Sequence, residues 1–373
     1  MCYGKPMNDD SPATGNQTRR RRFAPVGIIF GLLGLLLFAY FVRRAGLAEI
    51  GAGIRRLGFG FLLIIAISSV RHIVRSVAWT KCVEKPYRLR FRDAFAARLM
   101  GDALGNIIPL ASAAVSEPSK AVFVKDRLPL MVGLSALAIE NIFYSLSVTL
   151  FIFSGTATLL LSFALPKPLR YASIGALIVI LIIVPLGYFV IHRQAKLISG
   201  AFGFLAKRGI AASTMLRMKP RAEVFEERIY GFYQRNQSSL IPIFALELLF
   251  HIAGVVEIYT TLYFISPDVP PSLRGAFILE SVNRIINVAF KFVPLRAGVD
   301  EGGTGQVSKV IGFAKATGVT LAIVRKGRDI FWATIGILLM LRKGFSLRGE
   351  GEQSMISAEA DIRSQNSDLR SQI

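Results

Sequence analysis

The chain has 373 residues, of which 53% are apolar and only 18% are charged, and its mean hydropathy is +0.50. A soluble domain carries roughly 25% charged residues, so this composition excludes an ordinary soluble protein and indicates an integral membrane protein. The net charge of +21 does not indicate a nucleic-acid partner, because no soluble module combines basic residues with aromatic platforms. We expect anionic lipid head groups to attract these basic residues instead.

Apolar runs long enough to cross a bilayer recur along the chain. A membrane-spanning helix needs about 20 mostly apolar residues. The runs that reach this length are 24–42, 57–79, 129–153, 169–192, 239–265 and 319–341. The sequence therefore predicts an all-α polytopic integral membrane protein with about six to eight transmembrane helices.

Basic residues flank these runs in a pattern that predicts the topology. They precede 24–42, follow 57–79, fill the segment 193–237 and follow 319–341. By the positive-inside rule these four places, and with them both termini, face the cytoplasm of a bacterial inner membrane. One loop opposes the rule, because the span count places it outside although it contains Arg43, Arg44, Arg55 and Arg56.

The same boundaries divide the chain into three parts. Residues 1–23 form a basic cytoplasmic tail, and 24–341 form the transmembrane domain. The run 24–42 is interpreted as a retained anchor, since arginines rather than a small-residue cleavage site follow it. Within 193–237, the stretch "PRAEVFEERIYGFYQRNQ" has apolar residues at helical spacing and is predicted to lie along the membrane surface. Residues 342–373 are polar and predicted to be disordered.

Two apolar regions, 94–128 and 273–318, are interrupted by glycine, proline and charge. The first contains "PLASAAVSE" (109–117) followed by "PSKAVFV", and the second contains "PLRAGVDE" (294–301) followed later by "VSKVIGF". Irregular backbone is tolerated at membrane depth only where protein or a water-filled cavity surrounds it. We therefore expect two re-entrant helical hairpins, related as an inverted repeat, that line a polar cavity.

Ionisable residues inside the apolar runs support such a cavity, because a charge at the bilayer centre costs at least about 2.5–3.5 kcal/mol. Among the acids, Glu117, Asp300 and Glu301 are the strongest candidates, since they follow the prolines and have no evident local partner. The predicted substrate-binding residues are Arg71, Arg75, Asn106, Pro109, Glu117, Glu140, Arg284, Pro294, Arg296, Asp300, Glu301, Arg325 and Arg328.

Other interpretations of these charges stay open at this point. Arg71, Arg98 and Arg325 are also compatible with side chains that reach to the membrane interface. The four-residue spacings Arg98–Asp102 and Arg325–Asp329 are also those of structural pairs within one helix. His251 shares a helix face with Glu247, and we expect it to be packed and hydrogen-bonded, since no second histidine is placed to complete a metal site.

Several stretches together resemble the transmembrane-region family of lysylphosphatidylglycerol synthases, a flippase-like family. They are "SSVRHIVRSVAWTKCVE" (68–84), "GDALGNIIPLASAAVSEPSKAVFVK" (101–125), "FKFVPLRAGVDEG" (290–302) with "SKVIGF" (308–313), and "AIVRKGRDIFWATIGILLM" (322–340). The resemblance spans 24–341 and implies a membrane domain that moves aminoacylated phosphatidylglycerol, or in stand-alone members other lipids, between leaflets. Because the soluble aminoacyl transferase portion is not expected here, lysine transfer is not implied.

The leading hypothesis is therefore a flippase for an anionic, aminoacylated or sugar-bearing lipid. The arginines would bind its phosphate, and the acids would meet a cationic or hydroxyl-rich head group. The alternative is an ion-coupled transporter of a soluble solute. We expect no enzyme activity, cofactor or metal, because no nucleophile–base set or nucleotide-binding loop is evident. Membrane phospholipids are the expected partners, with a lipid-biosynthesis enzyme and a second copy of the chain as further candidates.

Overall fold

The computed structural model describes residues 40, 43, 47–107, 112–209, 211–291, 293 and 296–342, without the side chains of 47, 49, 106, 107, 112–114 and 188. All regular structure in these ranges is helical, which confirms the predicted all-α class. The predicted run 24–42, the polar tail beyond 342, and the two site prolines Pro109 and Pro294 lie outside the described residues.

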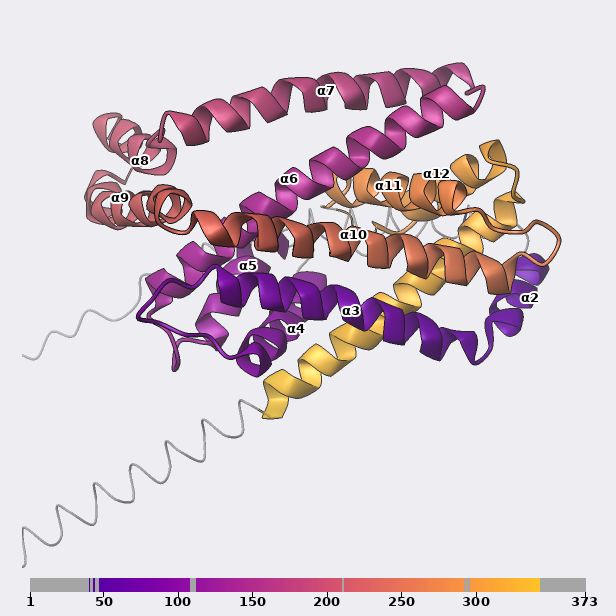
Figure 1. Ribbon diagram of the computed structural model, residues 1–373, viewed down its shortest axis with the longest axis horizontal. Coiled ribbons are helices and arrows are strands. Elements are labelled where there is room, and N and C mark those ends of the chain that lie inside the picture. Colours follow the sequence, from indigo (N-terminus) through magenta and orange to yellow (C-terminus); the bar gives the residue numbers. More distant parts are fainter. Residues whose placement is uncertain are drawn as a thin grey trace, which may run out of the picture.

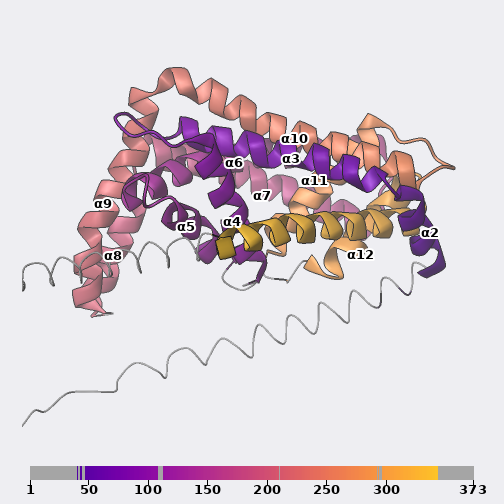
Figure 2. The same ribbon diagram turned by 90° about the horizontal axis from the view of Figure 1, so that it is seen from below.

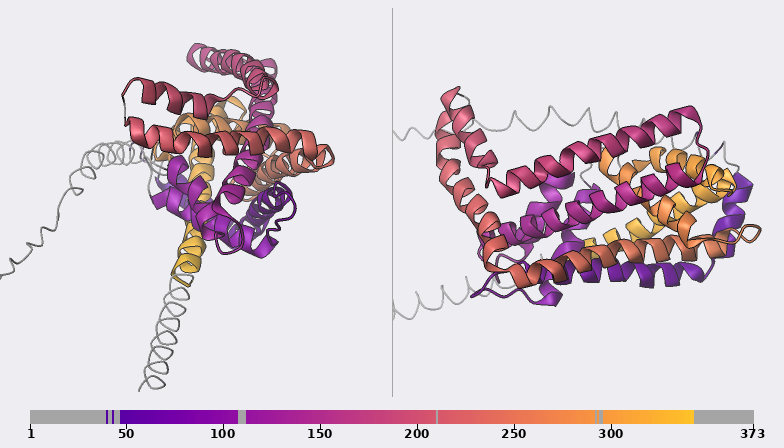
Figure 3. Two further views of the ribbon diagram at one scale, coloured as in Figure 1. Left: turned by 90° about the vertical axis from the view of Figure 1, so that its left-hand side faces the viewer. Right: turned by 45° about the horizontal axis from the view of Figure 1, so that its top comes forward.

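Among the described residues, four helices are long and apolar enough to cross a membrane, and they run side by side in the views of Figures 1 and 3. They are α3 (Gly60–Lys81), α6 (Leu130–Ser162), α7 (Lys167–His192) and α10 (Gln237–Ile265). Each matches one of the predicted apolar runs. The chain is thus a multi-pass membrane protein, while the total number of spans stays a prediction.

The last predicted run also forms a helix, over residues 315–342, which we call the final helix. It is not among the apolar helices described above, since its middle turns contain several charged residues, among them Arg325, Arg328 and Asp329. Figure 2 shows it along the underside of the molecule. Its charged middle turns belong to the protein interior, where Arg325 and Arg328 are buried.

Each of the two interrupted regions contains two helices, and the prolines at which breaks are predicted lie outside the described residues. The first comprises α4 (Phe91–Ile107) and α5 (Ser112–Phe123), which pack on each other. The second comprises α11 (Leu273–Ala289) and α12 (Val299–Val310). The chain turns into α12 at Gly298, whose φ of 78° favours glycine. Membrane depth and the inverted relation of the two pairs stay predictions.

The shorter helices lie at the two ends of the bundle (Figure 1): α8 (Leu197–Lys207) and α9 (Ala212–Arg235) at one, and α2 (Leu47–Leu57) at the other. The predicted helical segment in the basic region is therefore confirmed as α9. Its Glu226 accepts hydrogen bonds from the backbone N–H of Ile198 (2.6 Å) and the hydroxyl of Ser199 (2.6 Å), which satisfies donors at the start of α8.

Two apolar cores hold the bundle together. One surrounds Trp79 and Phe232, where α3, α4, α6 and α9 meet, and the other surrounds Ile64 and Leu262, where α3 and α10 pack against α11 and the final helix. By contrast, α7 exposes most of its apolar side chains, as a lipid-facing helix does. The polar site described below lies between the two cores.

Close helix crossings depend on small residues, and Gly336 shows this most clearly. A Cβ atom there would meet the backbone carbonyl of Leu99 and, at 2.7 Å, the Cβ of Ala103, both in α4. Small residues of this kind let helix backbones approach closely in membrane proteins. The final helix is therefore fixed against α4, and both helices contribute to the site.

We predict that Gly336→Leu lowers the unfolding free energy by about 1–3 kcal/mol, because the backbone of α4 has no room to accommodate the added side chain. The measurement is the temperature at which the detergent-purified protein loses its monodisperse peak. Gly187→Leu is the matched control, since a Cβ at Gly187 meets nothing within 4 Å. Equal thermal stability of the two variants would contradict the close crossing.

Candidate functional site

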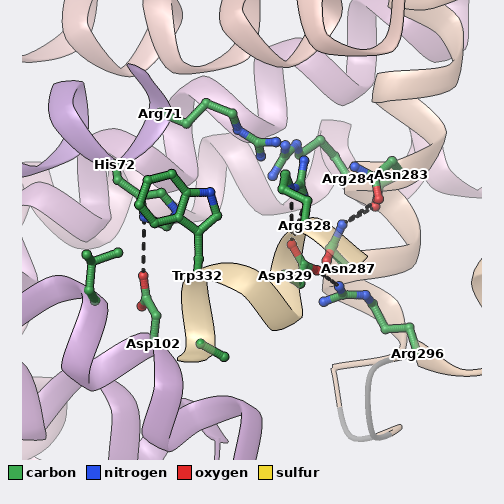
Figure 4. Close-up of a pocket in the computed structure, with 12 residues that line it drawn as sticks. Arg71, His72, Asp102, Asn283, Arg284, Asn287, Arg296, Arg328, Asp329 and Trp332 are labelled. Atoms are coloured by element: carbon green, nitrogen blue, oxygen red, sulfur yellow. Dashed lines mark hydrogen bonds and ion pairs between the residues drawn. The ribbon is translucent and has the colours of Figure 1, made fainter. Parts of the chain in front are cut away.

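Two adjoining cavities, of about 190 and 170 Å³, lie between α3, α4, α11 and the final helix. Figure 4 shows the larger one, with its lining residues as sticks. The two share Arg71, His72, Asp102, Arg328 and Asp329 as lining residues, so we treat them as one cavity. Its further lining residues are Ser68, Arg75, Arg98, Leu99, Phe250, Asn283, Arg284, Asn287, Arg296, Trp332 and Ala333.

Guanidinium groups dominate this lining. Arg71, Arg284 and Arg328 come from three different helices, and their guanidinium groups point toward one another in Figure 4. Three like charges this close in a buried place repel one another strongly. The three guanidinium groups are stable together because each forms an ion pair with a carboxylate.

Two glutamates behind the cavity wall hold these three arginines. Glu257 of α10 lies 3.1 Å from Arg71 and also pairs with Arg328. Glu280 of α11 pairs with Arg284 and lies 3.9 Å from Arg71. Both glutamates are buried, so their charges are screened little by solvent. These two glutamates therefore lie outside the cavity, while the three arginines that pair with them line it.

A second such arrangement lies beside it, centred on Glu140 of α6. Arg75 donates two hydrogen bonds to Glu140, from Nε (2.8 Å) and Nη2 (2.9 Å), and Arg98 donates a third (2.9 Å). The Arg75 guanidinium also lies 3.8 Å from the ring centroid of Tyr144, a cation–π contact. Bidentate pairing and ring stacking together fix the orientation of Arg75.

Asp329 and Asp102 provide the acidic part of the cavity wall. Asp329 accepts a hydrogen bond from Arg296 (2.9 Å) and another from Arg328 (2.7 Å). His72 lies 3.9 Å from Asp102, and its ring packs against Trp332 at a centroid distance of 4.8 Å. Figure 4 shows both arrangements.

Arg296 differs from the other arginines in exposure and in backbone. Its side chain is 24% exposed, and its φ of 52° is a left-handed conformation that is uncommon outside glycine, asparagine and aspartate. Strained positions of this kind persist where the surroundings enforce them, and they are concentrated at functional sites. Arg296 is thus the cation best placed to meet an incoming ligand.

The alternative interpretations of Arg71, Arg98 and Arg325 as interface-reaching side chains are wrong. These arginines are 9%, 1% and 3% exposed, and each bonds to an interior carboxylate. Arg98 and Arg325 do not form the expected four-residue pairs either. Arg98 bonds to Glu140 instead of Asp102, whose partner is Lys120 (2.9 Å). The carboxylate on another helix lies closer than the one on the same helix, because a charged side chain in apolar surroundings is stable only when it faces the protein interior.

The three acids that the sequence favoured, Glu117, Asp300 and Glu301, do not line the cavity. Glu117 does have a local partner, Lys120 three residues on (2.8 Å), and it also accepts from Asn141 (2.9 Å). It therefore lies beside the cavity rather than in its wall.

Asp300 and Glu301 form a separate buried cluster at the start of α12. Asp300 accepts from Arg325 (2.6 Å), and Glu301 pairs with Lys326 and accepts from the backbone N–H of Gly298 (2.7 Å). The cluster joins α12 to the final helix and contributes nothing to the cavity wall.

The structure thus brings together five of the predicted residues in the cavity wall: Arg71, Arg75, Arg284, Arg296 and Arg328. Glu140 lies directly behind it. Asn106 is in the last turn of α4, and its side chain is not described. The sequence interpretation missed Asn283, Asn287 and Trp332. The signal was available for the asparagines, because Glu280, Asn283, Arg284 and Asn287 form a polar stripe on one face of α11.

Metal chemistry finds no support in the described part of the chain, where no group of three His, Cys, Asp or Glu side chains is arranged to hold an ion. His251 is packed, as expected. Its Nε2 lies 3.2 Å from the hydroxyl of Ser147, and its ring stacks on Phe151 at 4.6 Å.

The family described as "Lysylphosphatidylglycerol synthase TM region" matches residues 25–336. The chain belongs to this family. Membership confirms the resemblance found in the sequence, and the family's match covers all the cavity residues. It associates the chain with lipid handling in a membrane. Comparisons with curated proteins and with solved structures gave no match.

We predict that Glu140→Gln destabilises the protein by about 3–5 kcal/mol, because it leaves Arg75 and Arg98 without their shared buried counter-charge. The measurement is thermal unfolding in detergent. Glu84→Gln is the control, since its partner Arg235 is 57% exposed and such pairs contribute about 0–1 kcal/mol. A Glu140→Gln protein as stable as this control would show that the buried network is not structural.

Proposed function

We propose that this protein is a lipid flippase that moves a phosphate-bearing lipid between the leaflets of a bacterial inner membrane. The observation that carries the proposal is the cavity itself, where guanidinium groups face inward and buried carboxylates hold them from behind. Family membership supports a lipid rather than another phosphate compound. The lipid is moved unchanged, so the activity is transport and not catalysis.

The chemistry of the wall favours phosphate. Guanidinium offers paired N–H donors that match two phosphate oxygens, and it stays charged under all physiological conditions. Arg71, Arg284 and Arg328 are already oriented by their carboxylates. A phosphate therefore meets donors that need little further ordering, and preorganisation of this kind favours binding.

The dimensions of the cavity fit a head group better than a whole lipid. Its two parts, of about 190 and 170 Å³, are each smaller than the roughly 300–1,000 Å³ of pockets that enclose a drug-sized ligand, and together they reach only the low end of that range. The acyl chains would then stay in the hydrocarbon while the head group passes through the protein. The first helices of the two interrupted regions, α4 and α11, both line the cavity, which suits them as the elements that open it alternately to each side.

The direct test uses vesicles of phosphatidylcholine that contain the purified protein and a trace of phosphatidylglycerol with a fluorescent acyl chain. A membrane-impermeant reductant destroys the label in the outer leaflet only. A flippase makes the whole label accessible over time, whereas protein-free vesicles protect about half. If label stays protected while the vesicles take up a soluble phosphate ester, the alternative of a solute transporter gains support. Chemical conversion of the lipid would support enzyme activity instead of transport.

For Arg296→Asn we predict a loss of leaflet exchange with an intact fold. Asparagine adopts the left-handed backbone more readily than arginine, and Asp329 keeps its bonds to Arg328. Removing one charged donor to phosphate costs about 1.5–3 kcal/mol, which is roughly a 10- to 100-fold loss of affinity.

The initial exchange rate at low lipid concentration is the measurement for this variant. Arg274→Asn is the matched control, because Arg274 is an exposed arginine on α11 outside the cavity. Wild-type exchange by Arg296→Asn would remove this arginine from the binding site.

A further inference from the structure

Glu247, in the middle of α10, is the exception in a network where the other acids are well paired. Its side chain is 0% exposed, yet neither carboxylate oxygen has a hydrogen-bond partner among the described residues. Its nearest cation is Arg75, whose Nε lies 3.6 Å from Oε2. That separation exceeds a hydrogen bond.

Arg75 does not satisfy Glu247, because the Nε atom that lies nearest to this acid already donates to Glu140. Its Nη2 also bonds to Glu140, and to Asn141 (3.2 Å). Glu140 and Glu247 therefore both face the Arg75 guanidinium, whose hydrogen bonds go to Glu140 rather than to Glu247. A buried, ionised carboxylate without hydrogen bonds is costly, and a proton removes the cost.

The groups around Glu247 come from several helices. Arg75 of α3, Arg98 of α4 and Glu140 of α6 all interact with it electrostatically, and so does the buried thiol of Cys82 at the end of α3. On α10 itself, His251 lies one turn further on and is engaged by Ser147. None of the cations in this group is free, since Arg98 also bonds to Glu140.

We propose that Glu247 carries one proton with each lipid phosphate, so that the flippase is a proton symporter. This inference rests on the proposed function. Arg75 lines the cavity on one side and faces Glu247 on the other. A phosphate that binds Arg75 adds negative charge and engages the cation nearest to Glu247, which also lines the cavity. The proton then stays on the Glu247 carboxyl group while the head group is bound, and it leaves when the phosphate leaves.

Linkage gives the direction of the effect. If phosphate binding favours the protonated acid, protonation favours phosphate binding by the same factor. One proton and one anionic lipid cross together without net charge. A proton gradient that is acidic outside therefore drives the lipid toward the inner leaflet, by up to about tenfold per pH unit.

The experiment measures how the same fluorescent phosphatidylglycerol distributes between leaflets at steady state, in phosphatidylcholine vesicles one pH unit more acidic outside than inside. Potassium and valinomycin hold the membrane potential at zero. The wild-type protein is expected to enrich the label several-fold in the inner leaflet. Glu247→Gln, which copies the neutral acid, is expected to exchange label yet leave the inner-to-outer ratio near one. Glu247→Asp restores a titrating group and part of the enrichment.

The possible outcomes test the role of Glu247, the proton coupling and the flippase activity separately. Enrichment by Glu247→Gln equal to wild type overturns the role of Glu247. Wild-type exchange with no enrichment overturns proton coupling but leaves the flippase intact, whereas a wild type that exchanges no label overturns the proposed function and the coupling with it. The matched control is Glu223→Gln, an exposed acid on α9 that pairs with Lys219 and is expected to enrich label as wild type does.

Discussion

The constraint that shapes this protein is the cost of placing charge inside a membrane. A charged side chain at the bilayer centre costs several kcal/mol unless it is paired, and this bundle buries many charged side chains. They are stable because arginines and carboxylates from different helices neutralise one another, as Arg71 and Arg328 do with Glu257. The same pairs hold α3, α10 and the final helix in register, so the network that makes the site also fixes the fold.

The pairing also supports the proposed ligand. Glu257, Glu280 and Glu140 behind the wall pair with the arginines. Under the proposed function, a phosphate meets guanidiniums that these pairs have already oriented, and this favours phosphate over the cationic groups that Glu117, Asp300 and Glu301 suggested. Within the described part of the network, Glu247 is the acid whose two carboxylate oxygens have no hydrogen-bond partner.

The sequence predicted the helical class and four of the apolar helices, because apolar length is a local property. It also selected the arginines of the wall, since a charge in an apolar run is conspicuous. It misassigned partners where the choice depends on packing: Arg98 bonds to Glu140, 42 residues away, rather than to Asp102 one turn on. No spacing along the chain encodes such contacts. Trp332 was missed for the same reason, because its neighbour His72 lies on α3.

The most direct measurement of the central claim is a contact between lipid phosphorus and arginine nitrogen in the membrane. Solid-state NMR on protein with ¹⁵N-labelled arginine, in vesicles containing phosphatidylglycerol, reports ³¹P–¹⁵N dipolar coupling at hydrogen-bonding range. The account predicts a coupling that weakens in Arg296→Asn, because one of several cavity arginines is lost, and that is unchanged in Arg274→Asn. A coupling as strong in Arg296→Asn as in the wild-type protein would contradict the account.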